Sequence, residues 1–211
     1  MPILAGQRLA VLDIETTGWR PTQGDTALEV ARVTIDDGAI VDGWASLVGP
    51  RRPIPPEATR VHGITEAMLA EAPAPEAVAR QIRDACADRT LVFHNAAFDL
   101  PFLAALLRAV RQPALWNPVI DTLGLARGLF GSGSNSLGEL LVRLDLPRED
   151  LHRALGDART AARILLTLAP IWERDRGIGS MHELAAASQD VMRESARRAA
   201  AARRAQASGL I

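Results

Sequence analysis

The sequence predicts an α/β protein with a mixed β-sheet flanked by helices. Its N-terminal third carries three strand-like apolar segments, and the remainder alternates longer helix-like stretches with short apolar runs. A meander followed by such an alternation is typical of a mixed sheet with helices packed on it. At 211 residues and 48% hydrophobic, the chain is long enough for one well-cored domain plus an appendage.

The first three strands are expected at residues 8–15, 28–35 and 39–48. The first has apolar residues on both faces, so we expect it at the centre of the sheet. The other two are separated by Asp36-Asp37-Gly38, whose Asp-Gly step supplies the positive φ that a tight hairpin turn needs. These two strands should therefore pair antiparallel.

The rest of the chain predicts helices with two short strands between them. Helical periodicity begins around Thr65, after a proline-rich connection at residues 49–56. Further helices and short strands are expected, in chain order, at residues 75–87 (helix), 90–94 (strand), 96–111 (helix), 119–121 (strand), 136–144 (helix) and 155–172 (helix).

A Gly-Ile-Gly-Ser stretch at residues 177–180 marks a soft boundary between a domain at 1–176 and a C-terminal extension at 177–211. Within the extension, residues 188–207 are rich in alanine and arginine with few apolar anchors, which predicts a helix with little core of its own. Residues 191–211 carry five arginines and one glutamate, a net +4, whereas the whole chain is at −1. The tail is therefore basic and the body acidic.

Composition excludes several classes of chemistry. The chain has no tyrosine and no lysine, so no mechanism that needs either side chain is open to it. Its one cysteine, Cys86, excludes an internal disulfide and a thiolate metal cluster, and we expect it to be packed and inert. No apolar run is long enough to span a membrane and no secretory signal opens the chain, so a cytoplasmic protein is expected.

Two carboxylates stand where apolar residues are expected on the first strand. Asp13 and Glu15 continue the face that carries Leu9 and Val11, because side chains alternate with a period of two. A divalent cation between them would offset their repulsion. The alternative is a solvated strand end that runs into the turn at residues 16–18.

The same anomaly occurs on two helices. Asp99 heads the apolar stripe of the helix expected at 96–111, and Asp157 heads that of the helix at 155–172. Either residue alone is explained by the favourable position of an acidic side chain near a helix start. Four carboxylates that converge on one sheet edge, however, need roughly two divalent ions to neutralise them.

His152 lies five residues before Asp157, with Gly156 between them. A histidine next to a metal cluster is a natural general base, whereas a solvated surface histidine is the alternative. The proximity to Asp157 favours a functional role for His152, and we keep the surface interpretation for His182.

Three segments carry these residues: Asp13-Ile14-Glu15-Thr16-Thr17-Gly18, His94-Asn95-Ala96-Ala97-Phe98-Asp99 and His152-Arg153-Ala154-Leu155-Gly156-Asp157-Ala158. They closely resemble the three motifs of the DnaQ-like (DEDDh) 3′-to-5′ exonucleases, which include the proofreading epsilon subunit of bacterial DNA polymerase III. Shorter segments at residues 61–65, 121–123 and 135–137 agree, and the resemblance runs from about Arg8 to about Trp172.

The resemblance implies a ribonuclease H-like fold with a mixed five-stranded sheet, and hydrolysis of DNA, with RNA as a further candidate, to 5′-mononucleotides. It implies two Mg²⁺ or Mn²⁺ ions. Asp13 would bridge them, Glu15 and Asp157 would complete one ion's ligands, and Asp99 would hold the other. His152 would deprotonate the attacking water.

The same resemblance implies a pocket for the terminal nucleotide, lined by Glu15, Thr16, Glu57, His62, Asn95 and Phe98. Glu15 and Thr16 would contact the 3′-terminal sugar, and Phe98 would lie against the last base, a contact that tolerates any base. Phe98 as a core residue and Glu57 as a solvated loop residue remain the alternatives, and Asn95 either orders water or satisfies backbone groups.

The expected partner is nucleic acid with a free 3′ end, with DNA favoured. The basic tail is either a solvated terminal helix, a phosphate contact, or a docking element for a DNA polymerase subunit or a second copy of the chain. A non-catalytic polymerase accessory or end-binding module is the alternative function, and the intact set of four carboxylates and His152 speaks against it. Strandedness and oligomeric state stay open.

Overall fold

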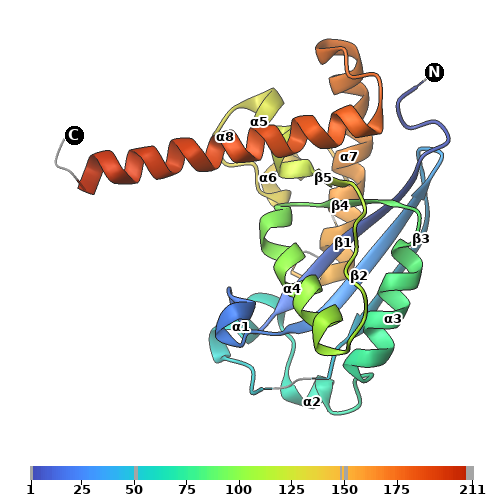
Figure 1. Ribbon diagram of the computed structural model, residues 1–211, viewed down its shortest axis with the longest axis vertical. Helices are drawn as coiled ribbons and strands as arrows, with labels where there is room; N and C mark the ends of the chain where they lie inside the picture. The colour runs from blue at the N-terminus through green and yellow to red at the C-terminus, as the bar shows by residue number, and fades with distance from the viewer. Residues whose placement is uncertain (1, 50–51, 148, 150–151, 208–211) are drawn as a thin grey trace.

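The computed structural model describes residues 2–49, 52–147, 149 and 152–207 (Figure 1). The predicted connection at 49–56 and the C-terminal extension therefore lie partly outside the described residues. The elements, in chain order, are β1 (Arg8–Thr16), the 3-10 turn η1 (Pro21–Gln23), β2 (Ala27–Asp36), β3 (Ala39–Leu47), α1 (Pro56–His62), α2 (Glu66–Leu69), α3 (Pro75–Cys86), β4 (Thr90–Phe93), α4 (Ala96–Ala109), β5 (Val119–Asp121), α5 (Thr122–Phe130), α6 (Leu137–Arg143), α7 (Ala154–Arg176) and α8 (Met181–Ala207).

The five strands form one mixed sheet in the order β3-β2-β1-β4-β5. The first three strands pair antiparallel, and β4 and β5 run parallel to β1. The predicted hairpin joins β2 and β3 through Asp37 and Gly38, with φ of 51° and 75°. The mixed sheet and the central place of the first strand are therefore confirmed.

Helices cover both faces of the sheet (Figure 1). On one face α3 and α4 pack on strand residues such as Leu12 and Phe93. On the other face α5, α6, α7 and the first part of α8 pack on Leu9, Val11 and Val92. The three layers bury side chains on both sides of β1, which explains why its sequence is apolar on both faces.

Two helices were missed from the sequence. Helix α1 begins at Pro56, ahead of the periodicity expected around Thr65, and only His62 of its residues is buried, so it has no apolar stripe. Helix α5 follows β5 directly, because Asp121 ends the strand and its side chain accepts hydrogen bonds from the first turn of the helix. No turn residues separate the two elements, so the sequence pattern gives no boundary there.

Helix α8 has two different halves. Its first half is packed in the core, with Met181, Leu184, Ala185 and Ser188 buried, while its second half projects beyond the body (Figure 1). The boundary at residues 177–180 stays a prediction, but the helix that follows it shares the core of the preceding residues.

The structure bears on two of the exclusions drawn from composition. Cys86 is buried at the end of α3, and burial raises the pKa of its thiol to about 12. It is therefore inert at neutral pH, as expected. Within the described residues, no helix combines the length and the apolar character that crossing a bilayer would require.

Gly124 tests the docking of α8. A Cβ atom at this position of α5 would lie 2.3 Å from the backbone oxygen of Ser188. Although alanine favours a helix by about 1 kcal/mol over glycine, we expect Gly124→Ala to lower the free energy of unfolding by about 1–3 kcal/mol because backbone must shift. Gly133→Ala, with open space around it, is the control. Equal urea-unfolding midpoints for the two variants would contradict this packing.

Candidate active site

Asp13 and Glu15 lie on the α7 face of β1, at the end where the strand leaves the core. Leu9 and Val11, on the same face, are fully buried under α7. Asp13 and Glu15 continue this face and are half-buried. The face predicted from the period of two is therefore the face that the strand presents to the helix.

Helix α7 brings Asp157 to the same place in its first turn. One carboxylate oxygen from each of Asp13, Glu15 and Asp157 lies within 4.8 Å of the other two. Oδ2 of Asp157 accepts a hydrogen bond from the backbone N–H of His152 at 3.2 Å. Oδ1 is buried and, within the described residues, has no hydrogen-bond partner. A buried oxygen without a partner, on a residue of an acidic cluster, fits a cation ligand.

Asp99 completes the group of four from the first turn of α4. Its side chain is 3% exposed, and Oδ1 accepts a hydrogen bond from the backbone N–H of Ile14 at 3.1 Å. This contact ties the start of α4 to β1 between Asp13 and Glu15. Asp99 does not belong to the group formed by the oxygens of Asp13, Glu15 and Asp157, but its charge raises the pKa of Asp13.

Burial and mutual repulsion raise the pKa values of these carboxyl groups. The pKa of Asp13 is well above its ordinary value, first because of burial and then because of Asp99 and Asp157. Burial, Asp157 and Glu29 raise the pKa of Glu15 to about 7, against a lowering by Arg153. Burial also raises the pKa of Asp157 and Asp99. A divalent cation would relieve this repulsion, and the all-oxygen donor set suits Mg²⁺ or Mn²⁺.

His152 stands on the turn just before α7. Its φ is +64° and its backbone N–H is held by Asp157, so the carboxylate fixes the backbone of the turn. The side chain is exposed and open to water. The structure therefore brings together the five residues that the sequence singled out, while Leu151, next to His152, lies outside the described residues.

A fifth acidic residue at the site, Glu29, was missed. It is 4% exposed and pairs across the sheet with Glu15. Its oxygens accept two hydrogen bonds from the guanidinium of Arg153, at 2.7 and 3.1 Å, and one from the backbone N–H of Ala154 at 3.0 Å. Glu29 thus anchors the start of α7 and engages Arg153, whose charge also acts on Glu15. The register that places Glu29 opposite Glu15 is not visible in either strand's own pattern.

Asp121 anchors the start of α4 in a similar way. Its carboxylate accepts hydrogen bonds from the backbone N–H groups of Asn95, at 3.0 Å, and Ala96, at 2.9 Å, as well as from the first turn of α5. Asn95 has a φ of +73°, a conformation that asparagine tolerates better than most residues. Four backbone donors satisfy this buried carboxylate, so it holds the turn that leads to Asp99.

A cleft of about 460 Å³ opens beside the carboxylates. All six residues expected in the nucleotide pocket line it: Glu15, Thr16, Glu57, His62, Asn95 and Phe98. Phe98 is half-buried and contributes both to the cleft and to the edge of the core, so the two alternatives for it coexist. Glu57 is exposed, and the pKa of the buried His62 is lowered, first by burial.

Trp19 also lines the cleft, and no sequence pattern singles it out. Its side chain is 82% exposed, and its ring meets that of Phe98 edge to face at a centroid distance of 5.7 Å. Phe98 in turn lies 5.3 Å from Phe102 of the core. An exposed tryptophan braced in this way offers a flat surface to a planar ligand.

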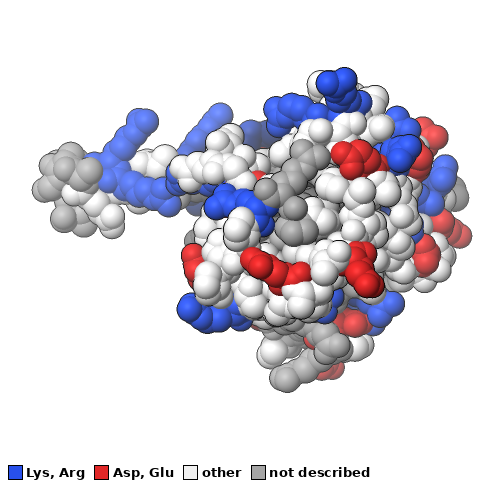
Figure 2. Space-filling model, turned by 90° about the horizontal axis from the view of Figure 1, so that it is seen from below, with Lys and Arg blue, Asp and Glu red and all other residues white. Residues whose placement is uncertain are grey.

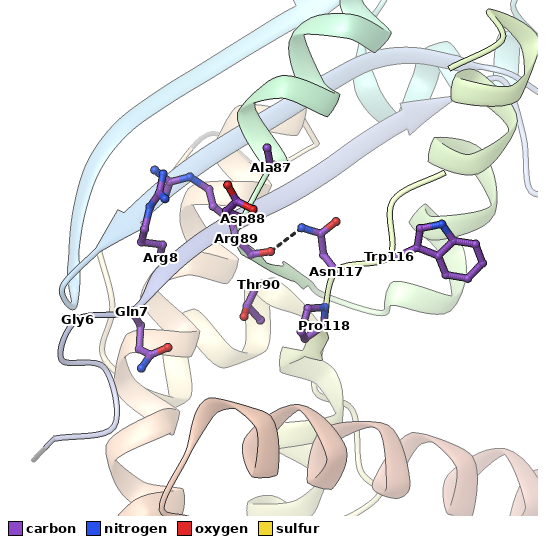
Figure 3. Close-up of a pocket in the computed structure, with 10 residues that line it drawn as sticks. All are labelled: Gly6, Gln7, Arg8, Ala87, Asp88, Arg89, Thr90, Trp116, Asn117 and Pro118. Carbon is purple, nitrogen blue, oxygen red and sulfur yellow. Dashed lines mark hydrogen bonds between the residues drawn. The ribbon is translucent and has the colours of Figure 1, made fainter. Parts of the chain in front are cut away.

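A second hollow, of about 550 Å³, lies at the start of β1, whereas Asp13 and Glu15 lie toward the end of this strand (Figure 3). It is formed where β1 and β4 begin, and Asn117 donates a hydrogen bond there to the backbone oxygen of Arg89 at 2.8 Å. Arg89 pairs with Asp36, and Trp116 points away from the other labelled side chains (Figure 3). None of the four clustered carboxylates lines this hollow, so the candidate site is the cleft beside them.

Comparison with known sequences agrees with this assignment. A family model described as Exonuclease (RNase_T) matches residues 10–165. The DNA polymerase III subunit epsilon-like protein of Rhodobacter capsulatus is 44% identical over 165 residues, which cover 76% of this chain and 23% of that protein. The PolC-type DNA polymerase III of Bacillus cereus is 35% identical over 79% of this chain and 12% of its own length. The chain therefore spans less than a quarter of these relatives.

Solved structures share the fold. Exonuclease X in complex with 5′ overhanging duplex DNA is 30% identical, with a TM-score of 0.68 over 85% of this chain and 99% of that one. Escherichia coli exonuclease I in complex with a dT13 oligonucleotide has a TM-score of 0.69 at 18% identity, over 81% of this chain and 42% of that one. The predicted ribonuclease H-like fold is thereby confirmed.

The raised pKa values predict how metal-free stability depends on pH. Folded Glu15 keeps its proton up to about pH 7, whereas its ordinary value is 4.5. Between these values the folded state holds more protons than the unfolded chain, so its free energy of unfolding falls as pH rises, by roughly 1–3 kcal/mol. Thermal unfolding in chelator from pH 4.5 to 7.5 measures this loss, and Mn²⁺ should reverse it. At pH 7.5, the metal-free Asp13→Asn variant should have a higher melting temperature than the metal-free wild type. A lower melting temperature would contradict repulsion among the carboxylates.

Glu29→Gln tests the anchor beside the cluster. The variant keeps an acceptor for Ala154 but frees Arg153 to compete for Glu15, so we expect Mn²⁺ affinity in calorimetry to fall about 10-fold or more. Adding Arg153→Ala should restore part of the affinity, because the competing cation is gone. Asp42→Asn, which breaks the exposed pair with Arg32 on the neighbouring strand, is the control. No difference between Glu29→Gln and Asp42→Asn would rule the anchor out.

Proposed function

The chain belongs to the exonuclease family, and on that premise we propose that it is a metal-dependent 3′-to-5′ exonuclease that releases 5′-mononucleotides from DNA. The observation that carries the proposal is the convergence of Asp13, Glu15 and Asp157 within 4.8 Å, beside a cleft with aromatic walls. A cluster of carboxylates holds cations and the cleft accepts a base, so a phosphate that lies between them would be exposed to attack.

Two divalent cations are proposed at the cluster. Asp13, Glu15 and Asp157 would supply oxygens to one, and Asp99 together with Asp13 would hold the second. When bound, such ions lower the pKa of an attacking water and stabilise the charge on the leaving oxygen. Four carboxylates balance the charge of two divalent ions, so the loaded centre accepts a phosphate without net repulsion. The chain's own part is to hold these oxygens in place from three separate elements.

The cleft is proposed to hold the terminal nucleotide. Trp19 and Phe98 offer ring faces and edges to a base, and stacking of this kind accepts every base. Thr16 and Glu15 lie where the strand β1 enters the cleft and are proposed to contact the terminal sugar. Attack on a phosphate next to a nucleotide seated in this way releases it from the 3′ end.

His152 is proposed as the general base. Its backbone is fixed by Asp157, a proposed cation ligand, so its ring is tethered near the place where water would be activated. Its exposed side chain can pass a proton directly to solvent. The lack of any lysine or tyrosine in the chain leaves no side chain of those types to compete for this role.

DNA is favoured as the substrate, because exonuclease X and exonuclease I were solved with DNA. An association with a DNA polymerase is a further proposal, supported by the similarity to an epsilon-like protein and to PolC-type polymerases. Proofreading would follow only if that association exists.

A labelled single strand tests the proposal. With a label at the 5′ end and Mg²⁺ or Mn²⁺ present, we expect a ladder that shortens from the 3′ end and release of mononucleotides. A matched RNA strand compares the two substrates. Binding of strand ends with no release in either metal would overturn the enzyme and indicate a non-catalytic end-binding module.

The variants separate the roles within the site. Asp13→Asn should abolish turnover, and His152→Ala should lower kcat by about 10²–10⁴. His182→Ala removes an exposed histidine from α8 and is the matched control, with no expected change. Equal kcat for His152→Ala and His182→Ala would remove His152 from the mechanism.

A further inference from the structure

The second half of α8 forms a basic arm, defined as residues 193–207. The sulfur of Met192, just before the arm, still accepts a hydrogen bond from Arg127 of α5, and the C-terminal part of α8 projects beyond the body (Figure 1). Arg197, Arg198, Arg203 and Arg204 of the arm are all exposed. Figure 2 shows basic side chains along the projecting helix. The arm also lies outside residues 10–165, which the family model matches.

The arm can be helical without a partner inside the chain. It continues a helix whose first half is already fixed in the core, so it needs no nucleation of its own. Its sequence is mostly alanine and arginine, two of the best helix formers. Among the residues of the arm whose burial the structure describes, none belongs to the core, so their side chains face solvent or one another.

The side chains of the arm fit a polyanion better than a protein. Residues 193–207 contain no apolar side chain larger than alanine, so they have no aromatic or large aliphatic anchor to bury in the core of a protein interface. Five arginines against Glu194 give the arm a net +4. The arms of two copies would repel each other. Arginine pairs instead with phosphate, and a row of phosphates binds such a helix through displacement of counterions.

Helix α8 contacts the C-terminal end of β5, and the candidate site lies near the C-terminal end of β1, to which β5 runs parallel. Ser188 of α8 accepts a hydrogen bond from the backbone N–H of Asp121 at 3.1 Å. Asp121 holds the backbone of Asn95, which lines the cleft. Ser188, in the fixed half of α8, is thus linked to the cleft through Asp121, and the two arginine pairs of the arm, 197/198 and 203/204, are about 9 Å apart along the helix axis.

We propose that the arm binds the phosphate backbone of the substrate away from its 3′ end, an inference that rests on the proposed nuclease function. The terminal nucleotide occupies the cleft, and the arm holds a part of the same nucleic acid that the acidic body would repel. The arm would therefore add affinity that depends on length and salt, without reading sequence.

The salt dependence of binding tests the arm. Binding is measured in the Asp13→Asn background, so that the nucleic acid is not cut. There, Arg197→Gln with Arg203→Gln should make the slope of the logarithm of the binding constant against the logarithm of salt concentration shallower by about 1.4 for a long single-stranded DNA. Arg80→Gln with Arg108→Gln, on exposed positions of α3 and α4, removes the same charge and is the control. Glutamine preserves helix propensity, and circular dichroism checks that the arm stays helical.

Equal slopes for the two double variants would overturn the role of the arm. So would a loss of self-association in sedimentation with an unchanged slope, because that result would assign the arm to contact between copies. Turnover of a dinucleotide by the wild-type chain reports on the cleft and the cations alone. If the wild type degrades neither dinucleotide nor long strand, the proposed nuclease function fails, whatever the slopes are.

Discussion

Repulsion among four clustered carboxylates is the constraint that the rest of this structure has to offset. The four carboxylates meet near the C-terminal end of the central strand, and they belong to Asp13 and Glu15 of β1, Asp99 of α4 and Asp157 of α7. Burial and the charges of its neighbours raise the pKa of Asp13 well above its ordinary value. Such a group opposes folding unless the surrounding elements are held firmly together. Sheet pairing, the two apolar layers and the helix starts supply that support, and a divalent cation would remove most of the repulsion.

Buried acids at this end of the sheet fall into two kinds. Glu29 and Asp121 are satisfied, by Arg153 and Ala154 in one case and by four backbone N–H groups in the other. Asp157 keeps a buried oxygen without a partner within the described residues. Glu29 fixes the start of α7 and Asp121 fixes the start of α4. The unpartnered oxygen of Asp157 can instead bind a cation. Glu29 and Asp121 therefore support the site, while Asp157 uses one oxygen to hold the backbone of His152 and keeps the other for a cation.

Charge is also divided along the chain, with a basic arm on an acidic body. The overall charge of −1 is the sum of a positively charged tail and a negatively charged body. An acidic body repels a polyanion except where cations sit in the carboxylate cluster, so binding away from the cluster needs a separate basic surface. The projecting half of α8 is such a surface, and its first half is fixed to β5 and α5 by Ser188 and by close approach to Gly124.

The sequence by itself determined the sheet class, the hairpin at Asp37-Gly38 and the faces of the four carboxylates, because the periods of strands and helices are local properties of the chain. Helices α1 and α5 could not be predicted from the sequence. Helix α1 has no apolar stripe, and α5 follows β5 directly with no turn between them. Only the tertiary structure decided that Glu29 faces Glu15, that Asp121 holds Asn95, and that Trp19 stands against Phe98. Each of these contacts joins residues from different elements, and their register and packing arise only when the elements assemble.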